Sequence, residues 1–456
     1  MAPTPIMEWL RGVGGPVQWF NQTLVMTAPP GVGEADAVVV LQALLDHHAM
    51  LRARVVEEAA ADGAGGWSLW VPAAGVVDAR DCLSSVTECS DEVVAAARSR
   101  LDPAAGMMIS ALWVTAKRQL VVVVHHLVVD GVSWRILLED LNIAWAQHHG
   151  GQPVALPASG TSFARWSGLL ADYARTAAVV GQVEAWRGVV AVPPALAAAD
   201  PQCDTYKTAG RLSVSLDVET TRQVLSVVPA AFHAGVQDIL LIAFGLACNE
   251  FLADHSGPVG IDVEGHGRHE EIFSDVDLSR TVGWFTTKFP VALSVGAVPW
   301  ARVIAGDSVL GSAVKDLKEQ LRALPDGLTY GLARYVNPDV DLAGCDPVIG
   351  FNYLGRLGGG GSFDQLWGVS PDSAAVAVAA GLIPMRLAHT LELNAGTVDT
   401  GSGQQLQANW AWAPSVLDGV AVGRLAQLWF EALAGMCDHV RAGGGGLTRL
   451  MSPRPG

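Results

Sequence analysis

Apolar residues recur along the chain at spacings that predict alternating helices and strands. The segment Ala37–Val55 carries apolar side chains at helical spacing, with His48 on its apolar side. Two β-rich runs, Trp113–Ala116 and Leu120–Val124, flank a short polar break and predict a hairpin. A helix is predicted next, over Trp134–His148. This order of strand, loop and helix favours a mixed α/β fold.

The second half of the chain repeats this alternation. A segment rich in Pro and Ala, Val190–Gln202, predicts a lobe boundary, which we place between residues 188 and 189. Strands are predicted at Arg211–Leu216, Val259–Val263, Leu387–Ala395 and Gln405–Trp412, and helices at Val236–Phe251 and Val416–Val440. The Gly-rich stretch Leu357–Ser362 predicts a flexible loop, and it lacks the Lys and Ser or Thr of a phosphate-binding loop.

Composition narrows the class of protein. The chain has 456 residues, of which half are apolar, so it has enough apolar surface for a large core and is not expected to be disordered. A net charge of −16 argues against nucleic acid as a partner. No apolar run reaches the ~20 residues of a membrane span, and the N-terminus lacks a leader pattern, so a cytoplasmic protein is expected. Six scattered cysteines without a CxxC pair indicate neither a zinc site nor a disulfide framework.

Three adjacent histidine pairs differ in their context. His48 of the first pair lies on an apolar helix face, which favours a hydrogen-bonded core histidine. His148 and His149 end a predicted helix before two glycines, which favours a helix C-terminus. The pair His125–His126 instead ends a strand of valines and precedes a tight connection into a helix. An imidazole at that place suits a general base, and the residues alone leave a catalytic and a structural role open.

A second polar cluster, Val263–Glu271, follows another predicted strand. Glu264 leaves the strand where the backbone opens through glycines, so partial burial would raise its pKa and suit it to acid–base chemistry. A solvated turn acid is the structural alternative. His266 and His269 lack a third ligand at a clear spacing, so no metal is expected.

Together these segments resemble the motif series of epimerization domains from non-ribosomal peptide synthetases, members of the condensation-domain superfamily. The residues that carry the resemblance are PIMEWL (Pro5–Leu10), HHLVVDGVSW (His125–Trp134), VEGHGR (Val263–Arg268), RTVGWFTTKFP (Arg280–Pro290), LPDGLTYG (Leu324–Gly331) and FNYLGR (Phe351–Arg356). The HHxxxDG pattern is shared across the superfamily, whereas EGHGR, RTVGWFT and FNYLG are more specific to epimerization. One departure is His269, which separates Arg268 from the acids that follow.

The resemblance implies an α/β fold of two chloramphenicol-acetyltransferase-like lobes, arranged as a V with a channel between them. Residues 1–188 would carry the HHxxxDG loop, and residues 189–456 would carry EGHGR, RTVGWFT and FNYLG. It also implies an isomerase that inverts Cα of an aminoacyl or peptidyl thioester, from L to D, on the phosphopantetheine arm of a carrier domain.

The resemblance assigns roles to individual residues. His126 and Glu264 are the acid–base candidates on opposite sides of Cα, and Tyr353 and Asn352 are candidates to relay a proton or support the enolate oxygen. For Tyr353, core packing is an open alternative. The remaining predicted residues form two groups: support of the site by His125, Asp130, Gly131 and Arg280, with Arg280 as the expected partner of Asp130, and a channel wall of Trp134, Trp284 and Phe285.

Two other functions remain open at this point. A condensation domain would form a peptide bond between carrier-bound substrates, and it needs no carboxylate opposite the histidine because the incoming amine is itself the nucleophile. A catalytically inactive carrier-docking domain would be expected to lose His126, Asp130 or Glu264, and all three are present. No intrinsic cofactor is expected, since phosphopantetheine arrives on the partner carrier domain. Neighbouring synthetase domains are further expected partners, and the chain is expected to be monomeric as an excised domain.

Overall fold

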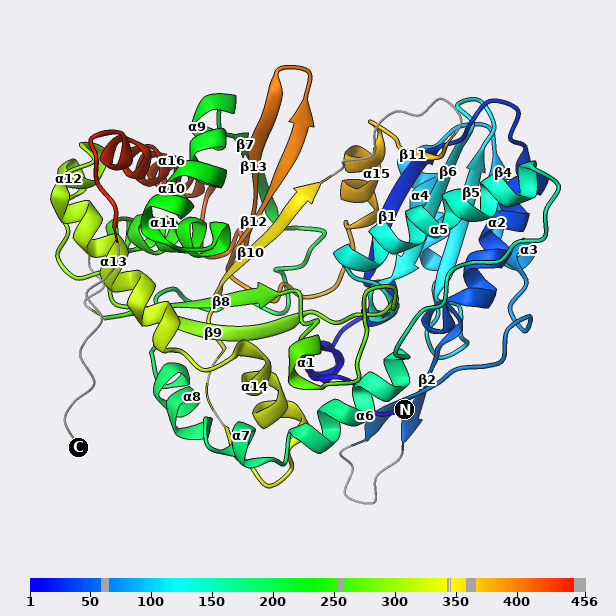
Figure 1. Cartoon of the computed structure of the whole chain (residues 1–456), viewed down its shortest axis with the longest axis horizontal. Helices are drawn as coiled ribbons and strands as arrows, with labels where there is room; N and C mark the ends of the chain where they lie inside the picture. The colour runs from blue at the N-terminus through cyan, green and yellow to red at the C-terminus, as the bar shows by residue number, and fades with distance from the viewer. Residues whose placement is uncertain (59–64, 253–256, 343, 345, 358–365, 447–456) are drawn as a thin grey trace.

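The chain folds into two lobes that lie side by side (Figure 1). The structure is a computed structural model, and it describes every residue except 59–64, 253–256, 343, 345, 358–365 and 447–456. Each lobe contains a mixed sheet with helices packed against it. The predicted two-lobed α/β class is therefore confirmed.

The sheet of the first lobe has the strand order β11-β1-β6-β5-β4. Strand β6 pairs antiparallel with both β1 and β5, which confirms the predicted hairpin. A separate antiparallel ribbon joins β2 to β3. The bounds are β1 (Asn21–Thr27), β2 (Arg54–Glu58), β3 (Gly66–Trp70), β4 (Leu83–Val86), β5 (Ile109–Val114), β6 (Gln119–His125) and β11 (Gly368–Val369).

The sheet of the second lobe has the order β7-β13-β12-β10-β8-β9. Strand β10 runs parallel to both of its neighbours, β12 and β8, and the other pairs are antiparallel. The bounds are β7 (Gly210–Ser215), β8 (Val259–Gly265), β9 (Thr287–Leu293), β10 (Ile349–Leu357), β12 (Leu391–Thr400) and β13 (Gly403–Trp412).

Helices pack against both sheets and fill the seam between the lobes (Figure 1). In the first lobe these are α2 (Glu34–His47), α3 (Ala79–Cys82), α4 (Asp91–Ser99), α5 (Gly131–His149) and α15 (Ser373–Ala380). In the second lobe they are α9 (Val218–Arg222), α10 (Val228–Phe232), α11 (Val236–Phe251), α12 (Trp300–Ile304), α13 (Ser308–Ala323) and α16 (Gly419–Arg441). Near the seam they are α1 (Pro5–Val13), α6 (Phe163–Tyr173), α7 (Ala177–Val180), α8 (Val183–Val190) and α14 (Gly327–Gly331). Short 3₁₀ and π turns lie at Val17–Trp19, Ala49–Arg52, His126–Val128, Gln223–Val227, Glu270–Ile272 and Leu332–Val336.

Alternation along the strands decides which side chains enter each core. Every residue of β6 is buried, with Val122 and Val124 in one apolar cluster and Val121 and Val123 in another, so this strand is covered on both faces. In the second lobe the apolar residues of β8 pack against the helices, whereas Glu264 lies on the other face. The second sheet therefore presents a polar face, with Glu264 on it, away from its helix-covered apolar face.

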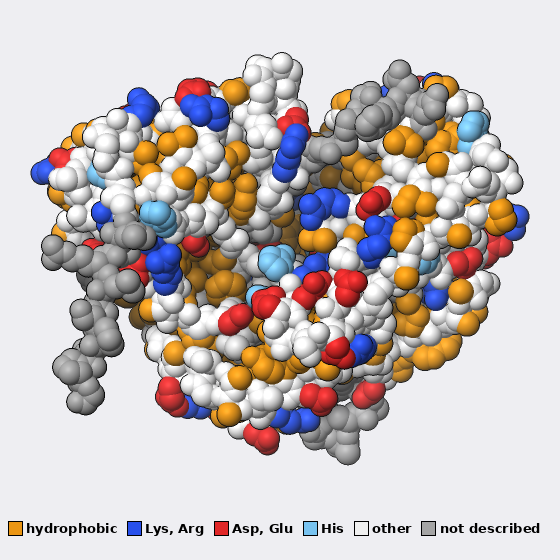
Figure 2. Space-filling view, viewed as in Figure 1, with side chains coloured by type: hydrophobic (Ala, Val, Ile, Leu, Met, Phe, Trp, Pro, Cys, Tyr) orange, Lys and Arg blue, Asp and Glu red, His pale blue; other side chains and the backbone are white. Residues whose placement is uncertain are grey.

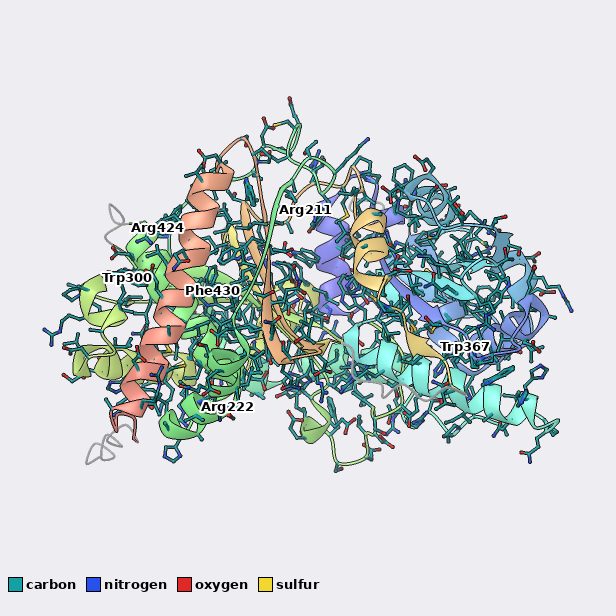
Figure 3. All side chains as sticks on the ribbon, turned by 90° about the horizontal axis from the view of Figure 1, so that it is seen from above. Arg211, Arg222, Trp300, Trp367, Arg424 and Phe430 are labelled. Atoms are coloured by element: carbon teal, nitrogen blue, oxygen red, sulfur yellow. The ribbon has the colours of Figure 1, made fainter. Side chains whose placement is uncertain are left out.

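The lobes exchange segments of chain. The boundary predicted between residues 188 and 189 falls inside α8, and β11 and α15 return from the second half to the first lobe. The Trp367 amide donates to Asn142 Oδ1 at 2.8 Å, and Asn142 Nδ2 donates to the Trp367 carbonyl at 3.1 Å. Figure 3 shows Trp367 over the first lobe, far from Arg424 and Phe430 of α16.

Several predicted elements have different bounds in the structure, among them the strand predicted at Trp113–Ala116, which is β5 at Ile109–Val114. The single helix predicted over Ala37–Val55 is wrong, because α2 ends at His47, where His48 takes an extended backbone and a 3₁₀ turn and β2 follow. The strand predicted from Leu387 begins only at Leu391, since His389 turns its side chain toward Asp262 before the ladder starts. The loop predicted at Leu357–Ser362 lies outside the described residues beyond Leu357.

Within the described residues no single helix is both long and apolar enough to cross a membrane. The bent pair Val218–Phe232 and Val236–Phe251 reaches that length and apolar character only when its two helices are taken together.

Candidate active site

The loop after β6 holds two histidines in different surroundings. His125 is fully buried, with Nε2 2.9 Å from the Val17 carbonyl and Nδ1 accepting from the Leu127 amide at 3.2 Å. Burial lowers the pKa of His125 to about 4. Both ring nitrogens are thus used by backbone groups, which agrees with the predicted supporting role.

His126 faces a site lined by aromatic rings. Its ring stacks on Phe20 with centroids 4.9 Å apart and lies 4.5 Å from the ring of Trp284. Its Nε2 is 2.8 Å from Gln22 Nε2, and the Trp134 indole donates to Gln22 Oε1 at 2.7 Å. The Gln22 amide nitrogen must therefore donate, so His126 Nε2 carries a lone pair. Burial lowers the pKa of His126 to about 4, which keeps the ring neutral near neutral pH.

Trp134 was predicted as channel wall, and the structure gives it a further task, the orientation of Gln22. Gln22 and Phe20 are site residues that sequence reasoning missed. Gln22 lies near the start of β1 and Phe20 directly precedes that strand, whose Asn21 is paired in register with His125. No motif in the sequence marks this pairing.

Asp130 ties together the His loop and two loops of the second half. Its Oδ1 accepts from the Ser133 amide at 2.7 Å and so caps α5, which begins at Gly131. Its Oδ2 accepts from the Phe285 amide at 3.2 Å. Arg268 Nη2 lies 3.2 Å from Oδ1, so the expectation that Asp130 pairs with Arg280 is wrong.

Arg268 reaches Asp130 because of the glycine before it. Gly267 has φ of +68°, and a Cβ there would lie 1.6 Å from the Phe285 carbonyl oxygen. The Arg268 guanidinium lies 4.0 Å from the Phe285 ring centroid and donates to the carbonyls of Leu278 and Thr281, both at 2.8 Å. These contacts fix the Arg268 side chain among the loops that surround the site.

Arg280 serves a neighbouring carboxylate instead. It forms an ion pair with the buried Asp140 on α5 and another with Glu139 at 3.1 Å. Asp140 also lies 3.0 Å from His48 Nε2. His48 is buried as predicted, but its Nε2 contact with Asp140 lacks hydrogen-bond geometry, so the predicted hydrogen bond is not confirmed. Arg280 ties its loop to α5 through its two ion pairs.

Glu264 lies on β8 beside β10. The register pairs Phe351 with Val263, so Asn352 falls next to Glu264, and Asn352 Nδ2 donates to Glu264 Oε2 at 2.9 Å. Burial, with the nearby Glu392, raises the pKa of Glu264 to about 7, while His389 acts in the opposite direction. The carboxyl group therefore holds its proton well above the pH at which an exposed glutamate ionises.

Tyr353 is not brought to Glu264. Neighbouring residues on a strand point to opposite faces, and Tyr353 packs against the apolar core of the second lobe. Its hydroxyl lies 3.5 Å from Thr397 Oγ1. Of the two roles left open for Tyr353, these contacts favour core packing.

A row of side chains links the surroundings of the two candidate residues. The Trp284 ring, next to His126, lies 6.5 Å from the Trp9 ring, and Lys288 Nζ lies 4.9 Å from the centroid of that Trp9 ring. Lys288 is in turn the register partner of Glu264. Figure 2 shows the surface hollowed between the lobes, with acidic, basic and histidine side chains along the hollow.

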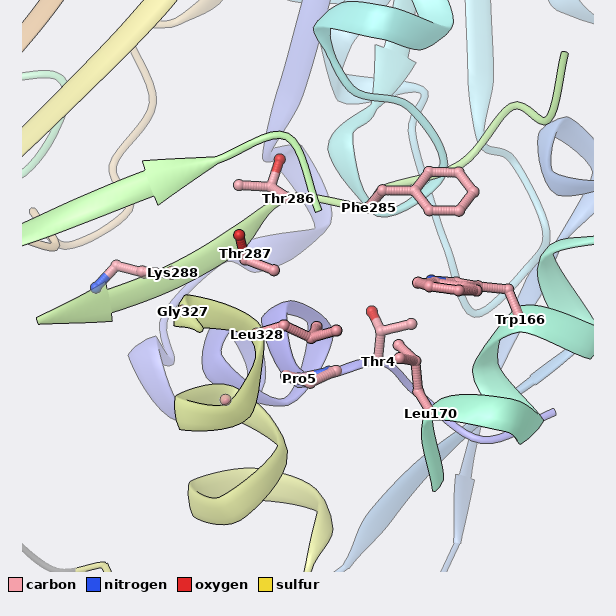
Figure 4. A pocket seen from close by; sticks show the side chains of 11 residues that line it. Thr4, Pro5, Trp166, Leu170, Phe285, Thr286, Thr287, Lys288, Gly327 and Leu328 are labelled. Carbon is pink, nitrogen blue, oxygen red and sulfur yellow. The ribbon is translucent and has the colours of Figure 1, made fainter. Parts of the chain in front are cut away.

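A small cavity lies beneath the segment that carries Phe285 (Figure 4). Helices α1, α6 and α14 contribute one side of this cavity. The segment that carries Phe285 therefore packs over the helices between the two lobes. Its lining residues are Thr4, Pro5, Trp166, Leu170, Phe285, Thr286, Thr287, Lys288, Gly327, Leu328 and Gly331.

One cluster among the described residues has the spacing to hold a metal ion, namely His47, His48 and Asp140. Asp140 is already paired with Arg280 in that cluster. His269, the departure noted in the sequence, lies 3.0 Å from Glu271 and 3.8 Å from Asp326.

Comparison with known proteins agrees with this geometry. The family model "Condensation domain" matches residues 16–356. The chain belongs to the condensation-domain family. It is 32% identical over 96% of its length to a linear gramicidin synthase of Brevibacillus parabrevis, and 34% identical over 96% to chondramide synthase cmdD of Chondromyces crocatus. The chain spans only 6% and 11% of these two relatives.

Solved structures of the family share the fold. The epimerization domain from the third module of tyrocidine synthetase B superposes with a TM-score of 0.80 at 26% identity, covering 97% of both chains. The X-domain from teicoplanin biosynthesis gives 0.70 at 14% identity over 96% of this chain and 95% of that one, which shows the shared fold alone.

The Asp130–Arg268 pair of this condensation-family chain is testable by mutant cycles. Arg268→Ala leaves a buried carboxylate without its cation, and we expect it to lower the free energy of unfolding by about 3–5 kcal/mol. Asp130→Ala should lower both the stability and the folded yield. In urea unfolding, Asp130 and Arg268 should show a coupling energy above about 0.5 kcal/mol, whereas Asp130 and Arg280 should be additive. Coupling of Asp130 to Arg280 alone would contradict the assigned pair, and the milder Asp130→Asn and Arg268→Lys serve if the alanine variants do not fold.

Burial of Glu264 also predicts a pH-dependent stability difference. Because the folded-state pKa is raised to about 7, the stability that its proton contributes is full below the unfolded pKa near 4.5 and is lost as pH rises through about 7. Glu264→Gln cannot ionise, so it should gain stability relative to the native protein between pH 5 and pH 8.5, by up to about 3 kcal/mol. Thermal and urea unfolding at both pH values measure this gain. The exposed control Glu57→Gln should show no such change, and an equal effect of Glu264→Gln at both pH values would contradict the assignment.

Proposed function

We propose that this domain epimerizes the Cα of an aminoacyl or peptidyl thioester carried on the phosphopantetheine arm of a carrier domain, from L to D. The observation that carries the proposal is the state of Glu264, a partly buried carboxyl that accepts from Asn352 and whose pKa is raised to about 7, so that it holds its proton in a large fraction of molecules near neutral pH. The likeness to the tyrocidine synthetase epimerization domain supports it.

The resting protonation states suit a two-residue proton exchange. His126 is neutral, with a lone pair on Nε2 that accepts from the Gln22 amide, and Glu264 retains its proton in a large fraction of molecules near neutral pH, so one can accept a proton while the other donates one. His126 Nε2 takes the proton from Cα, the C–H electron pair moves into the thioester carbonyl as an enolate, and Glu264 returns a proton to the opposite face of Cα. The substrate replaces the Gln22 amide at Nε2 when it binds.

The enolate oxygen needs hydrogen-bond donors as its charge grows, and Asn352 is a candidate for that role from the resemblance. In this proposal Asn352 orients the Glu264 carboxyl, since its amide nitrogen donates directly to that group. His125, Asp130 and Arg280 hold the loops, and Trp284 and Phe20 pack against the ring of His126.

Amide formation is the second candidate, because the family as a whole is defined by condensation domains. That reaction uses the histidine but not a carboxyl group opposite it. Carrier and neighbouring synthetase domains are the proposed partners in either case.

Loss of label from Cα tests the proposal. A carrier loaded with an aminoacyl-phosphopantetheine deuterated at Cα should lose deuterium to solvent and gain the D isomer when the domain is added. His126→Ala and Glu264→Gln should each slow net inversion by about two or more orders of magnitude, the usual scale of acid–base contributions. The control Glu271→Gln, an exposed acid in the same loop, should keep native rates.

The other functions give different outcomes. An amide product with retained deuterium, when an amine acceptor is supplied, would establish condensation and overturn the proposal. Absence of both exchange and amide formation from well-folded domain would indicate a docking role alone.

The pH dependence of label loss follows from the same two groups. Inversion requires protonated Glu264, so its rate should fall as pH rises through about 7. It also requires neutral His126, so the rate should fall as pH drops toward about 4. Initial rates of deuterium loss across the range, corrected for thioester hydrolysis without the domain, measure this profile. A rate that rises steadily through pH 8 would show that Glu264 acts in its ionised form.

A further inference from the structure

A second carboxyl group lies on the same sheet face as Glu264. Glu392 on β12 is the register partner of Gly350, and Asn394 on that strand is the register partner of Asn352. Asn352 donates to Glu264, and Asn394 donates to Glu392. The two carboxyl groups thus lie on β8 and β12, on either side of β10, and each is held by one asparagine of the facing pair.

The two carboxyl groups differ in what else surrounds them. Glu392 Oε2 lies 3.4 Å from His389 Nδ1, and His389 Nε2 lies 3.0 Å from Asp262 Oδ2. Glu392 therefore has a histidine ring nitrogen beside it as well as the Asn394 amide. Burial opposes ionisation of Glu392, yet His389 and Asn394 bring its pKa below the ordinary value.

Among the residues that the structure describes, Lys288 and Tyr206 are two other titratable groups near Glu264. Lys288, its register partner on β9, is paired with the buried Asp262. Burial of Tyr206, from the segment before β7, together with the charges of Glu392 and Glu264, raises the pKa of its phenol. Tyr206 therefore stays a neutral hydroxyl group.

We propose that Glu392 is a positioning residue for the reaction, an ionised carboxylate that holds Glu264 in its protonated form. Two nearby, partly buried carboxyl groups do not both ionise readily, and the one with more donors takes the charge. His389 and Asn394 give that advantage to Glu392, so the proton resides on Glu264. This inference rests on the proposed function, in which Glu264 supplies the proton that returns to Cα.

The experiment compares pH profiles of deuterium loss for the native domain, Glu392→Gln and Glu392→Asp. In the native profile the rate falls as pH rises through about 7, and this fall is the alkaline limb. Removal of the negative charge in Glu392→Gln should move the alkaline limb to a pH about one unit lower. Its rate should then fall about tenfold near pH 8 and less than about twofold near pH 5.5. Glu392→Asp keeps the charge and should keep the limb close to its native place.

Two further variants separate this role from a structural one. Asp399→Asn removes an exposed charge of the same strand, paired with Arg356, and should leave the profile unchanged. Asn394→Ala removes only a donor to Glu392, so Glu392 ionises less readily and the limb should move down by less than in Glu392→Gln. Asn394→Ala also serves if Glu392→Gln does not fold, as judged by thermal unfolding.

The outcomes are distinct from those of the proposed function. A native domain that releases no deuterium would overturn epimerization itself. In another outcome the native domain shows the expected alkaline limb while the Glu392→Gln rate is unchanged, or is lowered equally at every pH. That combination would overturn only the role of Glu392.

Discussion

The ion pair between Asp130 and Arg268 is the interaction on which the site depends. Both side chains are almost fully buried, with exposed fractions of 6% and 9%. Asp130 caps α5 and accepts the Phe285 amide, while Arg268 binds carbonyls of the loop that follows Glu264. Three segments distant in sequence therefore share one charge pair. A buried pair of this kind adds little net stability, but loss of either partner leaves a buried charge without a counterion. An arrangement of the loops that separates Asp130 from Arg268 is therefore unfavourable.

Burial then has opposite effects on the two titratable groups that the loops present. The neutral form of histidine is its deprotonated form, and that of glutamate is its protonated form. Desolvation disfavours charge in both, and so lowers the pKa of His126 and raises that of Glu264. One physical cause therefore prepares a proton acceptor and a proton donor together.

Local patterns predicted the parts of the site that lie within one element. The run of valines before His125, the helix after Asp130 and the strand ending near Glu264 follow from periodicity alone. The partner of Asp130 did not, because Arg268 and Arg280 are equally plausible in sequence and only the turn at Gly267 selects between them. Glu392 was invisible for a related reason: its nearness to Glu264 depends on the order β8, β10, β12, which is a non-local property. The same alternation rule that placed Asn352 beside Glu264 removes Tyr353 from it.

Reversibility adds a last constraint on the proposed chemistry. A turnover that starts from neutral His126 and protonated Glu264 ends with imidazolium and carboxylate, and this ion pair is the reactive form for the opposite isomer. An enzyme cannot alter the equilibrium between isomers, so both forms must be accessible in every cycle. In a desolvated site the ion pair is the costlier form, and proton exchange with solvent restores the neutral pair. The same desolvation that favours the neutral pair, which reacts with the L isomer, therefore also favours the return of the site to that pair after each turnover. The equilibrium between the neutral pair and the ion pair depends on the carboxylates and hydrogen-bond donors around Glu264.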